Sequence, residues 1–217
     1  MPVVPTVYGV PVEHSEDALL EAQDSMRTHL ARLKLGSRKL QHTIVRIGDL
    51  WCGADGTNQM RGPRVPPTLD AVRAVASMIH DERAEVRTQV MTTLSYAEEH
   101  TASTFDEILL ALDDGTPSVR LHAARLLLQL APIVPREAIP QLRGRLADPN
   151  PSVRWMIVRV LAGRISSNEL VAVLLDSLPK PGATRFVIHD WLRAANTLDP
   201  MPKALVAPVR DLEALLT

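Results

Sequence analysis

The chain has 217 residues, of which 46% are hydrophobic, which is enough to bury a core. Its formal net charge is −1, so no overall electrostatic field would attract nucleic acid or anionic membranes. Aromatic residues make up only 3%, which argues against a protein that stacks sugars or bases, and the single cysteine, Cys52, excludes an internal disulfide. No apolar run approaches the roughly 18 residues of a membrane span, and no basic region marks a signal peptide. We therefore expect a soluble, cytoplasmic protein.

The N-terminal part predicts an extended arm followed by a helical hairpin. Residues 1–14 are rich in proline and valine and are expected to be extended. Ser15 is a suitable N-cap, and acidic residues follow it in the first turn of the expected helix. Apolar residues recur at helical spacing on both sides of Gly36. This hairpin, residues 15–51, is expected to cap an array of repeats. A long loop rich in glycine and proline, residues 52–67, follows it.

Basic residues are concentrated in this part of the chain. Residues 25–64 hold eight Lys or Arg against two acids, whereas the first 24 residues hold five acids and no Lys or Arg. Clustered bases can contact nucleic-acid phosphates, so weak and salt-sensitive phosphate binding is one expectation. The alternative is a solvated face that the acidic first segment neutralises. The candidate phosphate contacts are Arg27, Arg32, Lys34, Arg38, Lys39, Arg46, Arg61 and Arg64.

A repeat runs through the rest of the chain, and a Val-Arg pair marks each copy. The pairs Val86-Arg87, Val119-Arg120 and Val153-Arg154 lie 33 and 34 residues apart, and a degenerate fourth copy lies at Thr184-Arg185. A leucine follows each arginine after seven residues and an apolar residue after three, so both fall on one helical stripe. Each copy therefore predicts a helix A, a tight turn and a helix B. Such hairpins bury their apolar faces only by stacking into a solenoid.

Segments 109–120 and 140–154 resemble HEAT repeats, because each places leucines in helix A, an aspartate in the turn and Val-Arg in helix B. The resemblance covers roughly residues 69–198, although the copies are shorter than the usual ~40–47 residues. It implies an all-α, right-handed α-solenoid. We expect about six hairpins in a single domain, with repeats over 68–198 and a capping helix over 199–217. The resemblance also implies a structural ladder between units, in which Asp81, Asp113 and Asp148 pair with Arg87, Arg120 and Arg154.

Helix B carries further residues on the face opposite its core stripe. Positions one and five after the repeat arginine point away from the core by roughly 160–200°. By the resemblance, this face lines the concave surface of the array. Large aromatic residues there do not serve stability, whereas Trp and Arg commonly anchor interfaces. We predict a partner-binding surface, unless neighbouring helices or the arm cover it, made of Leu121, Arg125, Trp155, Arg159, Phe186, Asp190 and Arg193.

The sequence shows no catalytic or metal-binding motif of the Cys-x-x-Cys, His-Glu-x-x-His, Gly-x-Ser-x-Gly or phosphate-loop type. Cys52 with His42 as a nucleophile is a weaker interpretation than a structural thiol. A metal site at Glu98-Glu99-His100 is likewise weaker than a solvated helix end. We therefore expect no catalytic residue, metal or cofactor, and a non-enzymatic scaffold or adaptor that holds a protein or peptide in its concave groove.

Two other functions follow from the resemblance alone. HEAT-like DNA glycosylases that remove alkylated bases place aromatic residues near a concave aspartate, and Phe186, Asp190, Trp191 and Trp155 would take these places. The near-neutral charge and the scarce aromatic residues argue against this enzyme. Chromophore-lyase subunits have similar short repeats, but only the type of repeat supports that function here. The fold by itself does not choose between these functions.

Overall fold

The computed structural model describes residues 14–34, 39–54 and 62–216. All regular secondary structure in these residues is helical and none is a strand, which confirms the all-α class. None of the helices in these ranges is long and apolar enough to cross a bilayer. The chain forms two compact units that divide between Thr104 and Phe105.

Some of the sequence-based predictions concern residues outside these ranges. They include nearly all of the extended arm predicted for residues 1–14, the helix end at Gly36 and the centre of the loop 52–67. Two predicted phosphate contacts, Arg38 and Arg61, lie there as well. Their placement stays a prediction.

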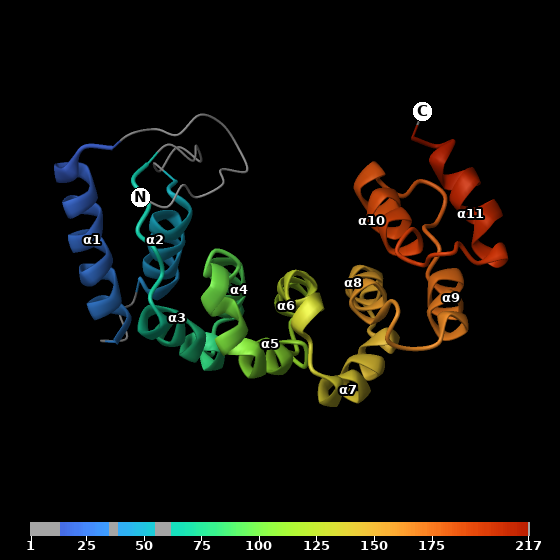
Figure 1. Ribbon diagram of the computed structural model, residues 1–217, viewed down its shortest axis with the longest axis horizontal. Helices are drawn as coiled ribbons and strands as arrows, with labels where there is room; N and C mark the ends of the chain where they lie inside the picture. Colours follow the sequence, from blue (N-terminus) through green and yellow to red (C-terminus); the bar gives the residue numbers. More distant parts are fainter. Residues whose placement is uncertain (1–13, 35–38, 55–61, 217) are drawn as a thin grey trace. The chain divides into compact units, whose positions relative to one another are not determined.

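The first unit is a set of packed helices in which α1, α2 and α4 lie side by side, and α3 contacts α1 and α4 (Figure 1). Ser15 caps the first helix as expected, because its Oγ accepts the N–H of Ala18 at 3.3 Å. Ile44, Ile47 and Trp51 of the second helix are fully buried. The helices are α1 (Glu16–Lys34), α2 (Leu40–Cys52), α3 (Leu69–Ala76) with its 3-10 extension (Ser77–His80), α4 (Ala84–Leu94) and the 3-10 helix Glu98–Thr104.

Helices α2 and α4 approach closely at Gly48. A Cβ atom added there would lie 3.1 Å from Oγ1 of Thr93 on α4, which is closer than ordinary van der Waals contact. The same Oγ1 donates a hydrogen bond to the carbonyl of Ile44 at 3.2 Å, one turn before Gly48. The missing side chain thus allows a hydroxyl group of α4 to bind the backbone of α2.

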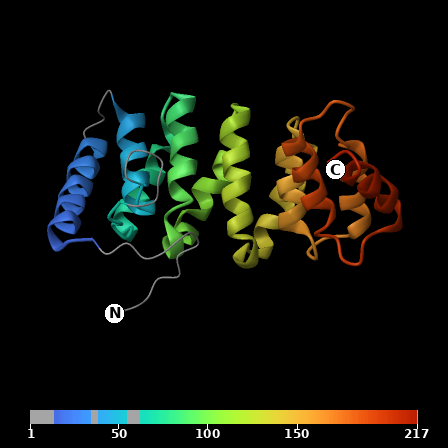
Figure 2. The same cartoon turned by 90° about the horizontal axis from the view of Figure 1, so that it is seen from above.

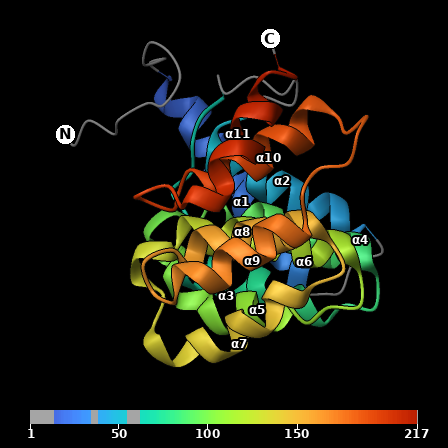
Figure 3. The same ribbon diagram turned by 90° about the vertical axis from the view of Figure 1, so that its right-hand side faces the viewer.

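The second unit contains three helix pairs, α5–α6, α7–α8 and α9–α10, followed by α11. Helix α8 contacts both α6 and α10, so the B helices lie in one row, which Figure 2 shows from above. Helices α5 and α7 lie on one side of α6 and α8 (Figure 3). The helices are α5 (Phe105–Ala111), α6 (Pro117–Gln129), α7 (Ile139–Gly144), α8 (Pro151–Leu161), α9 (Ser167–Asp176), α10 (Arg185–Ala195) and α11 (Lys203–Glu213), with 3-10 turns at Ala131–Ile133, Arg136–Ala138 and Arg145–Ala147.

The predicted helix-B stripe forms the core of both units. The leucines seven residues after the repeat arginine are all buried, and so are the apolar residues three positions after it. On helix A, Ile79, Leu112 and Leu146 are buried as well. Leu178 is exposed, because α9 ends at Asp176 and the offset leucine falls in the following turn. The helix-B stripe is therefore confirmed, and the helix-A stripe is confirmed except at Leu178.

The turn between helices A and B has the same hydrogen bonds in three copies. The turn aspartate accepts the backbone N–H two residues later, at 2.9, 2.7 and 2.8 Å in Asp81, Asp114 and Asp148. The repeat arginine six residues later donates NH1 to the carbonyl of that aspartate, at 2.7, 2.9 and 2.6 Å. In the second copy the equivalent turn aspartate is therefore Asp114, and the predicted Asp113 is wrong by one residue.

The resemblance implied a ladder of ion pairs between units, and Arg120 and Asp148 form such a pair across two successive copies. The carboxylate of Asp81 binds Arg83, and that of Asp113 binds Arg145. Arg120 reaches the next copy instead and binds Asp148, with Nε 2.8 Å from Oδ2. The reason is geometric, because each arginine directs NH1 at the backbone of its own turn, which leaves its other nitrogens for a neighbouring turn.

Candidate functional site

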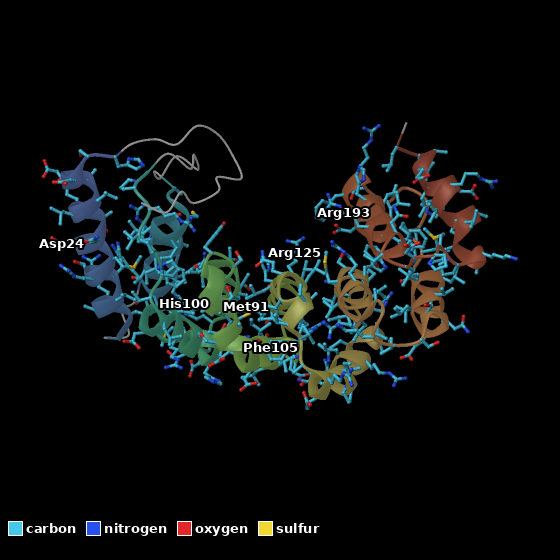
Figure 4. The ribbon with its side chains drawn as sticks, in the orientation of Figure 1. Asp24, Met91, His100, Phe105, Arg125 and Arg193 are labelled. Carbon is cyan, nitrogen blue, oxygen red and sulfur yellow. The ribbon has the colours of Figure 1, made fainter. Side chains whose placement is uncertain are left out.

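The row of B helices in the second unit is hollowed at one place that gathers most of the predicted partner-binding residues. The hollow has a volume of about 310 Å³ and is lined by residues of α6, α8 and α10. In Figure 4, Arg125 on α6 and Arg193 on α10 lie on the side turned away from α5 and α7. We define the arginine pocket as Arg125, Leu128, Met156, Arg159, Phe186, Asp190 and Arg193.

The repeat register explains why Arg125, Arg159 and Asp190 meet in this pocket. Arg125 and Arg159 each lie five residues after their repeat arginine, and α6 and α8 lie side by side. In α10 the same position is Asp190, and Arg193 follows it after almost one helical turn. Equivalent positions on neighbouring helices thus face one hollow.

The pocket has a surplus of positive charge. It holds three guanidinium groups and one carboxylate, which is a formal surplus of two positive charges. In the described part of the chain, none of these arginines forms an ion pair with a carboxylate. Arg125 lies 5.9 Å from the ring centroid of Phe186, within cation–π range, and NH1 of Arg159 contacts the sulfur of Met156 at 3.7 Å. Within the described residues, no ion pair therefore neutralises this surplus.

Two buried polar atoms of the pocket residues have no hydrogen-bond partner among the residues that the structure describes. They are Nε of Arg159 and Oδ2 of Asp190, whose side chain is 3% exposed. Burial lowers the pKa of Arg159, the charge of Arg193 lowers it further, and Asp190 acts in the opposite direction. Buried polar groups normally have partners, so hydrogen bonding beside the pocket is incomplete at these two atoms.

Trp155 does not line the pocket, and its predicted exposure is wrong. Its side chain is 1% exposed, and the indole Nε1 donates a hydrogen bond to Oγ of Ser177 at 2.9 Å. Helix α8 has α6 on one flank, α10 on the other and α9 nearby. A residue that points away from helix A of its own pair therefore still meets a neighbour. Leu121, at the same repeat position in α6, is half-buried and also lies outside the pocket.

Residues 105–187 match the family model of HEAT repeats, and this segment contains α5 to α9 and the start of α10. This part of the chain consists of HEAT repeats. Over residues 105–187, the match confirms the resemblance that the turn aspartate and the Val-Arg pair suggested. No curated protein matches the chain.

The HEAT repeats do not form the aromatic site that the glycosylase interpretation requires. Trp191 is fully buried, and its Nε1 donates a hydrogen bond to the carbonyl of Leu174 at 3.0 Å. Trp155 is buried as well, so neither indole can stack on a base. Of the four residues in that interpretation, only Phe186 is exposed, at 60%.

Two residues of the pocket, Leu128 and Met156, were not predicted. Leu128 lies eight residues after the repeat arginine Arg120, which is the position that Arg193 takes in α10. Applying this position to every HEAT repeat would have found Leu128. Met156 lies two residues after Arg154, between the predicted face and the core stripe of α8. No periodic pattern in the sequence distinguishes this position.

The basic residues of the first unit are partly occupied by internal contacts. Arg27 pairs with Asp24 at 2.8 Å and Arg46 with Asp49 at 3.1 Å, while Nε of Arg64 donates to a backbone carbonyl at 2.7 Å. Arg32 and Lys39 are exposed, and the side chain of Lys34 lies outside the description. Phosphate binding by this segment stays a prediction.

Cys52 lies half-buried at the C-terminal end of α2. Burial raises the pKa of the Cys52 thiol, and its Sγ contacts the carbonyl of Asp49 at 3.5 Å, which fits a structural thiol. His42 is exposed. In the described residues, no group of His, Cys, Asp and Glu could hold a metal ion, and the side chains of Glu98-Glu99 lie outside this description.

Proposed function

We propose that the chain is a non-enzymatic HEAT-repeat scaffold or adaptor that binds a protein or peptide partner on the face of its B helices. The arginine pocket is the observation that carries this proposal. Arginine and aromatic side chains are enriched at interfaces and dominate binding energies there. Here three arginines from three successive B helices line one hollow together with an exposed phenylalanine.

Phe186 supports a binding role in particular. Its exposed ring contributes little to the core, whereas a partner that covers it would remove apolar area from water. The guanidinium group of Arg125 lies over the ring, which restricts both side chains before binding. A pre-ordered surface loses less entropy when it binds.

The proposal includes the architecture expected from the repeats. The HEAT segment would continue as a right-handed α-solenoid of about six hairpins in one domain, with caps at 15–51 and 199–217 and the B helices along a concave groove. The repeated turn geometry and the family match support this arrangement. The lone half-buried thiol of Cys52 suits a reducing cytoplasm.

Selection of a random peptide library on the immobilised protein tests the proposal. We expect the enriched peptides to share a motif and to lose at least tenfold in affinity for an Arg125→Glu/Arg193→Glu variant. Arg136→Glu is the matched control, because Arg136 is an exposed arginine of the same unit outside the pocket. Circular dichroism would establish that the variants fold.

Selection that yields no shared motif would contradict the scaffold proposal. Enriched peptides that bind the double variant as tightly as the wild type would contradict the location on the B helices. Binding of oligonucleotides that depends on Lys39 but not on Arg193 would instead favour the nucleic-acid interpretation of the basic segment.

A further inference from the structure

We propose that the arginine pocket recognises an acidic peptide segment, in which an Asp or Glu carboxylate binds among the three arginines and an adjacent apolar side chain packs on Phe186. This inference rests on the proposed function and names the chemistry of the partner. The pocket is defined by residues of α6, α8 and α10, all within the second unit.

The charge of the pocket indicates the first feature of the ligand. Its formal surplus of two positive charges has no neutralising carboxylate in the described part of this unit. The guanidinium group presents donors in a planar fork that matches a carboxylate, and such charge-assisted hydrogen bonds are stronger than neutral ones. A bound carboxylate would also reduce the repulsion between Arg159 and Arg193.

The apolar lining indicates the second feature. Leu128, Met156 and Phe186 form the rest of the wall beside the arginines. A free inorganic anion would leave these surfaces in water, whereas a peptide can place an apolar side chain against them. The volume of about 310 Å³ is at the low end of ligand pockets and suits one or two side chains.

Asp190 favours a peptide over a nucleic-acid phosphate backbone. Asp190 lines the pocket beside the arginines, and its buried Oδ2 has no donor among the described residues. A peptide carries a backbone N–H close to each acidic side chain and can supply that donor, whereas the phosphates of a nucleic-acid backbone only accept hydrogen bonds. The ring of Phe186 already has Arg125 over it, which leaves less room for a stacked base.

Fluorescence anisotropy with two matched peptides tests the inference. One labelled peptide of ten residues alternates glutamate with leucine, and the other has glutamine at every glutamate position. We expect the glutamate peptide to bind at least tenfold tighter, and its affinity to fall as salt increases. Arg193→Glu should weaken it by roughly 10- to 100-fold, as expected for charge-assisted hydrogen bonds. Arg136→Glu should leave it unchanged.

A reversed-charge peptide gives a second measurement that does not depend on loss of binding. With lysine in place of glutamate, the peptide should prefer the Arg193→Glu variant to the wild type. Equal affinity for the glutamate and glutamine peptides would overturn the inference. Stronger competition by a single-stranded oligonucleotide or by inorganic phosphate than by unlabelled glutamate peptide would overturn it as well.

The two proposals fail in different ways. If library peptides without acidic residues bind in a manner that depends on Arg193, the acidic ligand is wrong and the scaffold function stands. If neither the library nor the glutamate peptide gives binding that depends on the pocket, both proposals are wrong.

Discussion

Arg120 and Asp148 form a buried ion pair that links two successive HEAT repeats. Nε of Arg120 lies 2.8 Å from Oδ2 of Asp148, and NH2 lies 3.2 Å from Oδ1. The third nitrogen, NH1, donates to the carbonyl of Asp114 at 2.9 Å in the turn of its own repeat. The side chains are 10% and 1% exposed. One arginine therefore joins two consecutive turns.

Removing this arginine should be far more destabilising than removing an arginine of the pocket. Arg120→Ala leaves the carboxylate of Asp148 buried without its charged partner, which typically costs about 3–5 kcal/mol in the free energy of unfolding. Arg125→Ala, on the half-buried B-helix face, should cost less than about 1 kcal/mol. Urea unfolding of the two variants measures the difference, and equal losses would contradict the assigned roles. If Arg120→Ala does not fold, the milder Asp148→Asn tests the same pair.

Trp155 should behave as a core residue. Trp155→Ala removes a fully buried indole and should lower the free energy of unfolding by about 3–5 kcal/mol. Ser177→Ala, which removes only the acceptor of the indole N–H, should cost about 1–3 kcal/mol. Thermal unfolding measures both effects. A melting temperature for Trp155→Ala close to that of the wild type would show that the indole is not buried.

The contact at Gly48 should make that position intolerant of large side chains. Gly48→Leu must displace Thr93 and should destabilise the protein by about 1–3 kcal/mol, despite the better helix propensity of leucine. Gly144 is the matched control, because it is helical and exposed and a Cβ there meets no atom within 4 Å. Gly144→Leu should be neutral or stabilising in urea unfolding. The opposite order of the two variants would refute the close approach of α2 and α4.

Stability should decrease at mildly acidic pH because of His29. Burial lowers the pKa of this histidine below its ordinary value of 6.5, and the charges of Arg32, Arg46 and His42 lower it further. The unfolded chain therefore binds more protons as the pH falls below about 6.5, and stability is lost progressively down to the folded pKa. The free energy of unfolding should thus fall between pH 7 and 5. His29→Leu should flatten this dependence, and an equally steep curve in the variant would contradict the assignment.

Sequence periodicity predicted which residues lie along a helix stripe, but not what lies beside each helix. The leucines of helix B were correctly placed in the core, because a spacing of 3.6 residues determines the side on which they lie. Trp155 was misplaced because its burial depends on the lateral neighbours of α8, which periodicity within one helix does not contain. Asp113 and Asp114 are adjacent, and only their hydrogen bonds distinguish the turn residue.

The meeting of Arg125 and Arg159 follows from the repeat register, whereas the depth of the pocket does not. Arg125 and Arg159 occupy one repeat position, so stacking brings them together in any array of these helices. Met156 and the buried carboxylate of Asp190 depend on how closely α8 and α10 approach. Such distances are set by the packing of many side chains.

The central claim is that the arginine pocket is a binding site. Two-dimensional ¹H–¹⁵N NMR of the labelled protein tests it most directly, because the Nε–H signals of arginine report each guanidinium group separately. On titration with the glutamate peptide, the account predicts shifts of the Nε–H signals of Arg125, Arg159 and Arg193 and of backbone amides near Phe186 on α10, while the signal of Arg136 stays in place. Shifts confined to the basic residues 25–64, or unchanged signals from all three pocket arginines at saturation, would contradict the claim.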